Sequence, residues 1–399
     1  VTGGYADGLA EDGDGGGIRS LGGTVMLTDC LLRDNAADGG GGVAVAFGAI
    51  DLTRCVFHGN EVSCSGGGVL AYYSEATLRH CRFLENDARS GGGMWSCHCE
   101  TRLRDCVFVQ NHALNGGGAY DDADLEIDAS FVATNCKFYG NAADNEGGGL
   151  NSDSANGDLT LVGCVFSDNS AYYAGGMLRY GRRTALTNCA FTANEAEEAS
   201  AISNNSEHPL AIQNCVFWNN PSLMDRPYDF DFVTIAYTCI QGGWEGEGNI
   251  DADPLFVDAD GADDVPGTLD DDLRLQAGSP CIDAGDNGAI PVAGLADLDG
   301  HYRRFDDPGT ADTGLGVAPI VDMGAYEFGS TQPPLWGDLN CDGAVNGFDI
   351  DPFVAALANP EGYASSYAHC HAGLADCNGD GAVDAFDIDA FVMILVGGA

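Results

Sequence analysis

The chain has 399 residues, of which 61 are acidic and 16 are basic, so its formal net charge is −45 at pH 7. Such a surface repels nucleic acid and anionic membranes, which argues against phosphate binding as a function. The sequence contains no run of about 20 apolar residues, so we expect no membrane insertion. The negative charge instead attracts divalent cations and suits a secreted, extracellular or cell-surface protein in a calcium-rich exterior.

A cysteine recurs through the first half of the chain at a nearly constant interval. The cysteines of this frame are Cys30, Cys55, Cys81, Cys106, Cys136, Cys164, Cys189, Cys215 and, as a weaker match, Cys239. Their successive spacings are 25, 26, 25, 30, 28, 25, 26 and 24 residues. A period in this range is typical of a solenoid in which each repeat forms one coil. The two longer intervals predict loop insertions near DDADLEID and NSDSANGD.

Each frame cysteine lies within a short alternating pattern. An apolar residue usually stands three positions before it and a phenylalanine two positions after it, while residues such as Arg82 and Lys137 between them point outward. Alternation with a period of two indicates strands rather than helices. Coils of about 25 residues built from short strands and turns predict an all-β fold, a right-handed parallel β-helix, over residues 1–245.

An asparagine follows each of the first eight frame cysteines by five residues, at Asn35, Asn60, Asn86, Asn111, Asn141, Asn169, Asn194 and Asn220. Stacked coils place equivalent residues roughly 4.8 Å apart. We therefore expect interior ladders of cysteine and phenylalanine, with asparagine at a turn where it adopts left-handed geometry and bonds to neighbouring coils. Glycine runs after the asparagines predict a tight corner. A metal or electron-transfer role would need converging ligands rather than one thiol per coil, so packing is favoured.

After about residue 245 the period stops, and residues 246–329 are rich in Asp, Gly and Pro. The stretches DADPLFVD, SPCIDAGD, DLDGHYR and DMGAYEFG resemble the end segment of secreted bacterial β-helix proteins of the choice-of-anchor type, common in planctomycetes. The resemblance covers roughly residues 30–329 and implies a surface or secreted protein with a C-terminal sorting module and no defined activity. We expect residues 246–329 to form a loop-rich β extension that caps the open edge of the last coil.

A short linker, residues 330–336, leads to two acidic loops within residues 337–399. The sequences DLNCDGAVNGFD and DCNGDGAVDAFD place oxygen ligands at positions one, three, five, seven, nine and twelve of a calcium loop, with glycine at position six. The expected ligands are Asp338, Asn340, Asp342, Ala344 through its carbonyl, Asn346 and Asp349, and then Asp376, Asn378, Asp380, Ala382 through its carbonyl, Asp384 and Asp387. Because an apolar helix follows each loop, we predict two Ca²⁺ ions rather than two acidic turns.

The duplicated loop, with Asp instead of Glu at position twelve, resembles a type I dockerin over residues 337–399. The resemblance implies binding to a cohesin module through residues on the helices. Dockerins usually carry Ser or Thr at loop positions ten and eleven, where this chain has Gly347–Phe348 and Ala385–Phe386. We therefore expect calcium binding without a conventional cohesin partner, and the two phenylalanines either serve another partner or pack internally.

Seven cysteines lie off the ladder: Cys64, Cys97, Cys99, Cys281, Cys341, Cys370 and Cys377. A secreted protein can hold disulfides, and we prefer a Cys341–Cys370 bridge that ties the first calcium loop to the segment between the repeats. Cys377 is expected to stay free. Cys97 and Cys99 point to one side of a strand and His98 to the other, which favours a bridge with Cys64 or plain packing over a metal site.

Two functions fit this sequence. The first is a non-catalytic extracellular scaffold or adhesion protein whose calcium module mediates attachment or self-assembly. The alternative is a carbohydrate-active enzyme, either a polysaccharide lyase with a base near bound Ca²⁺ or a glycoside hydrolase with paired carboxylates. Candidate bases are Arg79, Arg82, Arg102, Arg104, Arg179, Arg182 and Arg183. The stretches AYY, MWS, AYD and MLRY form either an aromatic sugar-binding face or an ordinary strand surface.

The chain opens at VTGGYADGLAEDGDGGG, which is already Gly-rich and shows no signal peptide, so we expect a processed or truncated start. An uncapped first coil exposes unpaired backbone groups that recruit another chain. A head-to-tail homopolymer is therefore an expected form of assembly, with a missing upstream cap as the alternative. Such a contact joins two different surfaces and propagates into a fibre unless it closes a ring.

Overall fold

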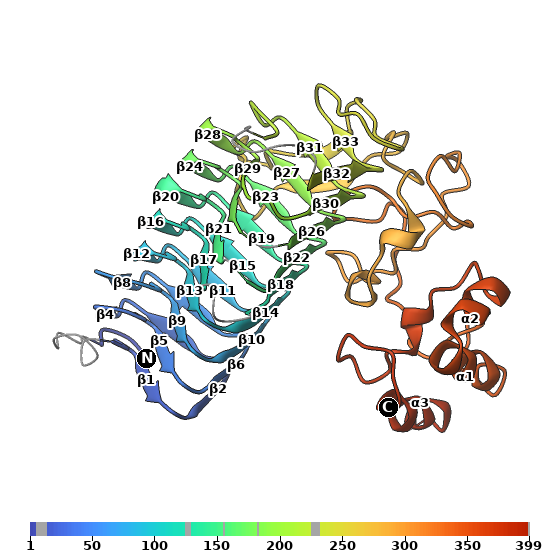
Figure 1. Cartoon of the computed structure of the whole chain (residues 1–399), viewed down its shortest axis with the longest axis horizontal. Helices are drawn as coiled ribbons and strands as arrows, with labels where there is room; N and C mark the ends of the chain where they lie inside the picture. The colour runs from blue at the N-terminus through green and yellow to red at the C-terminus, as the bar shows by residue number, and fades with distance from the viewer. Residues whose placement is uncertain (5–13, 124–128, 155, 182, 225–231, 398–399) are drawn as a thin grey trace.

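The computed structural model describes residues 1–4, 14–123, 129–154, 156–181, 183–224 and 232–397. Its larger part is the expected right-handed parallel β-helix, in which each coil contributes one strand to each of several parallel sheets. Figure 1 shows the coils stacked from the blue strands β1 and β2 at one end to β32 and β33 at the other. The predicted fold class is confirmed.

Four long sheets build the wall of the β-helix. The first sheet contains β1 (Ile18–Leu21), β5 (Val43–Ala46), β9 (Val69–Tyr72), β13 (Met94–Cys97), β17 (Ala119–Ala123), β21 (Leu150–Ser154), β25 (Met177–Tyr180) and β29 (Ile202–Asn205). The second sheet contains β2 (Thr24–Thr28), β6 (Ala49–Thr53), β10 (Glu75–Arg79), β14 (Glu100–Arg104), β18 (Phe131–Thr134), β22 (Asp158–Val162), β26 (Arg183–Thr187), β30 (Leu210–Gln213) and β32 (Val233–Ala236).

The other two sheets are made of shorter strands. The third sheet contains β3 (Leu31–Arg33), β7 (Val56–His58), β11 (Arg82–Leu84), β15 (Val107–Val109), β19 (Lys137–Tyr139), β23 (Val165–Ser167), β27 (Ala190–Thr192), β31 (Val216–Trp218) and β33 (Cys239–Ile240). The fourth sheet contains β4 (Ala36–Ala37), β8 (Glu61–Val62), β12 (Asp87–Ser90), β16 (His112–Asn115), β20 (Ala142–Glu146), β24 (Ser170–Tyr173) and β28 (Glu195–Glu198). Part of the first predicted insertion, residues 124–128, lies outside the described residues.

The coils stack in phase, so equivalent residues lie over one another. Phe83 pairs with Phe57 on one side and with Phe108 on the other. The rings of this phenylalanine ladder are stacked with centroids 4.5–5.0 Å apart. Because every ring between Phe57 and Phe217 contacts two others, the ladder forms a continuous apolar core along the tube.

The cysteine ladder is also interior, as expected. Seven of its cysteines, from Cys55 to Cys215, are fully buried, and only Cys30 in the first coil is half-buried. Burial raises the pKa of Cys136 and of Cys164 well above the usual thiol range, so these thiols stay protonated. No ladder cysteine belongs to a metal-binding group within the described part of the chain, which agrees with the packing interpretation.

The asparagine ladder crosses every coil as a chain of amides. Asn86, for example, donates from Nδ2 to the carbonyl of Phe57 at 3.0 Å and to Oδ1 of Asn111 at 2.9 Å. The expected left-handed geometry was assigned to the wrong residue. The positive φ belongs to the residue before the ladder asparagine, such as Glu85 (φ 52°) or Gln110 (φ 51°). That residue turns the chain, which leaves the asparagine side chain free to point inward and bond between coils.

The glycine runs form the expected tight corner. A Cβ at Gly93 would lie 2.6 Å from the carbonyl oxygen of Gly118 and 2.8 Å from Cδ1 of Phe108. Gly91, at the start of the same run, adopts φ 65°. A side chain at this corner would therefore push neighbouring coils apart, and glycine is required by the coil spacing itself.

The extension, residues 246–329, mostly lies along the flank of the β-helix rather than over its end. Its elements are β34 (Phe256–Asp258), β35 (Asp272–Leu275), η3 (Asn287–Ala289) and η4 (Val292–Gly294). Only the first few residues extend the last coil, where the Ile240 amide donates to the Ile250 carbonyl at 2.8 Å. The expected cap is thus correct for that short stretch and wrong for the rest, because Leu275, Met323 and Tyr326 pack on the outer side of the third sheet.

Three asparagines at one turn of the β-helix hold the extension in place. Asn135, Asn188 and Asn214 each adopt positive φ one residue before a ladder cysteine. Their Nδ2 groups donate to backbone carbonyls of the extension, those of Asp297, Asp322 and Asp286, each at 2.9 Å. Because a left-handed residue points its side chain away from the core here, the turn supplies a row of donors to the flanking segment.

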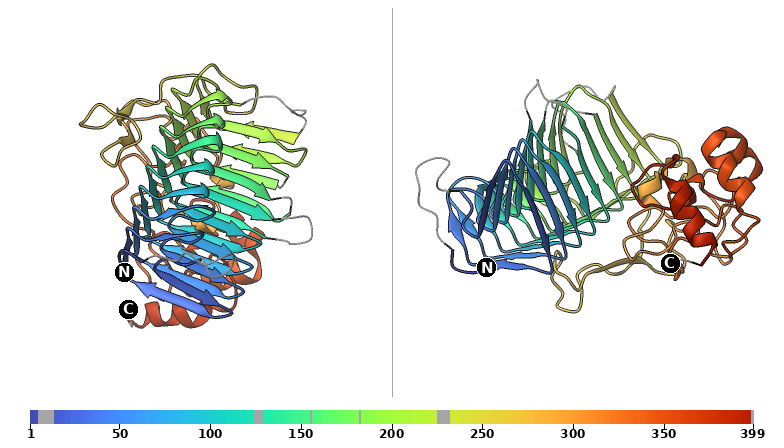
Figure 2. Two further views of the ribbon diagram at one scale, coloured as in Figure 1. Left: turned by 90° about the vertical axis from the view of Figure 1, so that its left-hand side faces the viewer. Right: turned by 90° about the horizontal axis from the view of Figure 1, so that it is seen from below.

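The C-terminal module consists of α1 (Ile350–Ala358), α2 (Pro360–Ser366), η5 (Ala372–Ala375) and α3 (Asp387–Leu395). It lies beside the stack and not beyond its last coil (Figures 1 and 2). Its core, which includes Phe353, Tyr363 and Phe391, is continuous with Ile290 and Leu295 of the extension. No helix among the described residues has both the length and the apolar character that a membrane crossing requires.

Residues 330–336, expected as a linker, are bonded to the extension. The amide of Tyr302 donates to the Gln332 carbonyl at 2.7 Å, and Ser330 Oγ donates to the Tyr302 carbonyl at 2.8 Å. The module therefore follows the extension without a free hinge at this point.

Replacing Asn111 by Ala should destabilise the β-helix strongly. The change removes partners from the Phe83 carbonyl, the Asn141 Oδ1 and both amide groups of Asn86. Each buried polar group left without a partner costs roughly 1–3 kcal/mol, so we expect a loss of at least about 3 kcal/mol in urea unfolding. The control is Asn145→Ala, whose Nδ2 donates only to Asn115 among the contacts found. A loss at Asn111 no larger than at Asn145 would contradict the structural role of the ladder.

Candidate calcium-binding module

The first acidic loop, residues 338–349, folds around its own carboxylates. Oδ2 of Asp338 accepts the Gly343 amide at 3.0 Å, and Oδ1 of Asp342 accepts the Ala344 amide at 3.0 Å. Asp349, the residue at position twelve, is fully buried and accepts the amides of Leu339 and Asn346. Gly343 adopts φ 87°, a conformation that a residue with a side chain rarely takes, which explains glycine at position six.

The second loop, residues 376–387, repeats the first almost bond for bond. Oδ2 of Asp376 accepts the Gly381 amide at 3.0 Å, and Oδ1 of Asp380 accepts the Ala382 amide at 2.9 Å. Asp387 is fully buried and accepts the amides of Asn378 and Asp384. Gly381 adopts φ 90°. Two loops that share a sequence pattern therefore also share a hydrogen-bond network.

The donor set of each loop is chemically suited to a hard cation. Every predicted ligand offers oxygen, from carboxylates, asparagine amides and one backbone carbonyl, which is the chemistry that Ca²⁺ prefers. Burial raises the pKa of Asp338 and of Asp376, and a bound cation would act in the opposite direction. In the described residues, neither loop brings three acidic side chains to within 4.8 Å of one another, so asparagine and carbonyl oxygens would have to complete the site.

Cys341 and Cys370, the preferred pair, form a disulfide in the structure. It joins the first loop to the segment after α2, where the Cα atoms are 5.7 Å apart. Cys377 is free and half-buried, as expected. Cys97 and Cys99 are buried, Cys64 is exposed, and none of the three forms a disulfide, so packing rather than a bridge accounts for this group. Cys281 is also free and buried.

The module exposes a duplicated set of apolar side chains. Phe348 and Phe386 are 78% and 79% exposed, and they do not pack internally. On the helices that follow, Ile350 and Val354 in the first repeat match Ile388 and Val392 in the second, and all four are exposed. The sequence analysis singled out only the two phenylalanines. The four aliphatic residues repeat at the same spacing of 38 residues, and this repeat could have predicted them as well.

The second loop faces the outer side of the second sheet across a cleft of about 600 Å³. Arg79, Arg102 and Arg104 line one wall, and Asp376 to Gly381 line the other. Each arginine already has a carboxylate within 4 Å, at Asp51, Glu100 and Asp105 respectively. Of the other predicted bases, Arg179 is buried against Asn204, Arg183 pairs with Asp158, and Arg182 lies outside the described residues.

Part of the predicted aromatic face exists as a cluster near the first coils. Tyr72, Tyr73 and Trp95 lie there together with Phe47 and His98, which the sequence analysis did not place in this cluster. Phe47 and Tyr73 stack with centroids 5.5 Å apart. A cavity of about 390 Å³ lies beside Phe47, Tyr72 and Trp95. Besides these aromatic rings, Asp14 and Arg19 also line the cavity.

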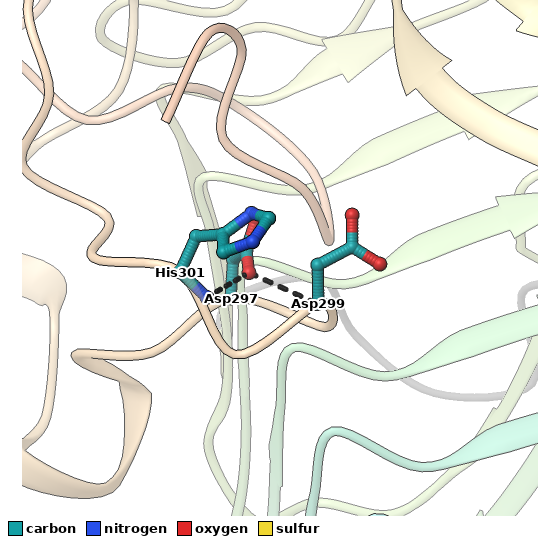
Figure 3. Close-up of side chains that lie close together, drawn as sticks. All are labelled: Asp297, Asp299 and His301. Atoms are coloured by element: carbon teal, nitrogen blue, oxygen red, sulfur yellow. Dashed lines mark hydrogen bonds between the residues drawn. The ribbon is translucent and has the colours of Figure 1, made fainter. Parts of the chain in front are cut away.

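Another acidic group lies in the extension, at Asp297, Asp299 and His301. Figure 3 shows that Oδ1 of Asp297 accepts the backbone amides of Asp299 and His301. Its Oδ2 accepts the Glu327 amide, and both oxygens of Asp299 bind Arg274 at 2.7 Å. These carboxylates are fully engaged with donors of the protein, so the group is a turn with an ion pair.

The stacked coils, the flanking extension and the helical module define a parallel β-helix protein with an appended small domain. Residues 10–156 match the family described as right handed beta helix region. Among solved structures, the crystal structure of pectate lyase Pel9A is similar, with a TM-score of 0.35 and 10% identity over 74% of this chain and 73% of that chain. A likeness this weak has no bearing on activity. Comparison with curated proteins gives no match.

Chelation should unfold the module while the β-helix stays intact. Without a cation the carboxylates of each loop repel one another, and like charges disfavour their close packing. We expect chymotrypsin to cut at the buried residues Phe353 and Tyr363 after EDTA treatment, while the buried Phe108 and Phe138 remain uncut. The full chain with Asp349→Ala and Asp387→Ala serves as the control and should be cut equally with and without Ca²⁺. Equal resistance of the unmodified chain in both conditions would contradict calcium binding by these loops.

Proposed function

We propose that the chain is a non-catalytic extracellular scaffold protein that attaches to a protein partner through a calcium-ordered, dockerin-like module. The observation that supports this most directly is the duplicated exposed apolar face around Phe348 and Phe386. Large apolar side chains rarely gather on a free surface without a partner. Two copies of the same exposed set, in two repeats of one module, argue against chance exposure.

The loops connect calcium binding to the display of this face. The amide of Phe348 donates to Oδ1 of Asn346 at 2.9 Å, and the amide of Phe386 donates to Oδ1 of Asp384 at 2.7 Å. Asn346 and Asp384 are the predicted ligands at position nine of each loop. A cation that fixes these ligands also fixes the backbone of the phenylalanine two residues later. Attachment should therefore require calcium.

The chemistry of the face points to a cohesin-like protein with an apolar recognition surface. Hydroxyl groups, the usual contacts of dockerins at positions ten and eleven, are replaced here by glycine, alanine and phenylalanine. Aromatic side chains dominate the energy of many protein interfaces. The β-helix would then serve as a rigid spacer, since parallel strand pairing links successive coils along the whole stack of described strands. A second copy of the chain is the other candidate partner.

A carbohydrate-active enzyme is the alternative function, and one observation favours it. The cleft of about 600 Å³ places three arginines opposite the second calcium loop, where an acidic polysaccharide would meet positive charge and a cation. Each of these arginines is, however, already paired with a carboxylate. An arginine that acts as a base must lose its proton, which a neighbouring carboxylate opposes.

A binding measurement separates the two functions. The full chain is immobilised in Ca²⁺ and tested against a panel of recombinant cohesin modules and against itself in solution. We expect calcium-dependent binding that Phe348→Ser weakens about thirtyfold, as the loss of roughly 2 kcal/mol at a hot spot implies, and that Phe348→Ser with Phe386→Ser abolishes. Phe47→Ser, which removes a phenylalanine that is 58% exposed elsewhere, is the matched control and should bind normally.

The contrary result comes from a parallel assay on acidic and neutral polysaccharides. Depolymerisation by the full chain that is lost in Arg79→Gln with Arg104→Gln, yet kept in the double phenylalanine variant, would establish the enzyme instead. Binding that survives EDTA would likewise contradict the proposed role of calcium.

A further inference from the structure

The extension buries five acidic side chains, each no more than 7% exposed. They are Asp271, Asp283, Asp297, Asp322 and Glu327. A buried carboxylate is costly unless donors or cations compensate for its lost hydration. Each of these residues therefore needs hydrogen-bond donors or a cation that compensates for its buried charge.

Four of the five have donors from the protein. Asp271 accepts the Gly267 amide, and Asp297 accepts three backbone amides. Asp322 accepts the amides of Asp283 and Phe328 at 2.8 and 2.6 Å. Glu327 accepts the amides of Phe305 and Asp322. Backbone N–H groups thus compensate for the buried charge of these four side chains.

Asp283 is the exception. It is fully buried, and neither oxygen of its side chain makes a hydrogen bond of good geometry, although the Asp307 amide lies near enough to favour its charged form. Its neighbours add further negative charge. One carboxylate oxygen each of Asp283, Asp306 and Asp312 lies within 4.8 Å of the other two. Burial, and then the carboxylates of Asp312 and Asp306, raise the pKa of Asp283 to about 6. Without a bound cation, the three carboxylates would repel one another at neutral pH.

The backbone holds these three side chains together in a fixed way. The Asp283 carbonyl accepts the amides of Thr313 and Gly314 at 2.9 and 3.0 Å, which ties the loop that carries Asp306 and Asp312 to the turn that contains Asp283. Asp283 itself adopts φ 52°, a left-handed conformation that is uncommon for a residue with a side chain. The fold of the extension therefore fixes the buried member of the cluster, Asp283, and holds the loop with the exposed Asp306 and Asp312 against it.

The donor set selects the ligand. Three carboxylates without sulfur or imidazole suit a hard cation, and a site between a buried turn and an exposed loop can be completed by waters and carbonyls. We propose that Asp283, Asp306 and Asp312 bind a calcium ion that fastens the 306–314 loop to the rest of the extension. This site is separate from the two module loops, and it does not depend on the proposed attachment function.

The test counts calcium ions bound to the full chain by equilibrium dialysis with ⁴⁵Ca²⁺. In a background of Asp349→Ala and Asp387→Ala, which disables both module loops, we expect one Ca²⁺ per chain to remain. Adding Asp306→Asn and Asp312→Asn should reduce this to none. Adding Asp260→Asn and Asp264→Asn instead removes the same charge from exposed acids of the extension and should leave one ion bound.

A second variant protects the test against misfolding. Asp283→Asn removes a buried charge without a partner, so the variant should unfold at a higher temperature than its parent in EDTA and gain nothing when Ca²⁺ is added. Its parent in the same background should gain thermal stability with Ca²⁺. Retention of the bound ion in Asp306→Asn with Asp312→Asn, or an unchanged calcium response in Asp283→Asn, would overturn the proposal.

The outcomes also distinguish this site from the module. If the background variant binds no calcium while the unmodified chain binds two ions, the extension site is wrong and the module loops stand. If the unmodified chain binds a single ion that the loop variants keep, the module loops are wrong and the extension site stands.

Discussion

The in-phase stacking of successive coils is the constraint on which the rest of the structure depends. Each ladder asparagine from Asn60 to Asn194 bonds to the asparagine of the next coil and to a carbonyl of the previous one, so its position is fixed on both sides. A shift of one residue in any coil would move its cysteine and phenylalanine from the core to the surface. The corner glycines follow from the same constraint, because a Cβ there would meet the backbone of the adjacent coil.

The turns between the sheets connect the β-helix to the rest of the chain. In the coils that the extension covers, three turn positions before the ladder cysteine hold Asn135, Asn188 and Asn214, and their amides bind the extension. In coils that it does not cover, the equivalent residues include Arg54 and His80. The acidic segments then fold on a frame that has few charges in its core. We propose that calcium balances the negative charge of these segments, both in the module loops and at Asp283.

The repeat made most of the β-helix predictable. A single coil gives a weak signal, but eight aligned copies of Cys and Asn, seven of them with Phe, show which positions face inward. The left-handed turn was placed one residue too late, because a side-chain pattern reports the direction of a residue and not its φ angle. The flank position of the extension was missed for a related reason: Leu275 and Met323 occur once, so no period indicates which surface they cover.

The candidate sites show the same division. Ligand spacing was sufficient to predict two calcium loops, since each position in such a loop has a defined chemical role. The exposure of Phe348 was left undecided because the residue at position eleven can face either the solvent or the module core. Asp283 lies within SPCIDAGD, while Asp306 and Asp312 lie more than twenty residues later, and only the folded extension brings them together.

The central claim is that the β-helix is stable without metal, whereas the C-terminal module and residues 306–314 need a cation to stay ordered. Hydrogen exchange of the full chain, measured by mass spectrometry, tests this claim most directly. With Ca²⁺ and after chelation, the amides of β11, β15, β19 and β23 should stay equally protected. The module and residues 306–314 should exchange much faster once the cation is removed. Identical exchange of those segments in both conditions, or loss of protection throughout the β-helix strands, would contradict the account.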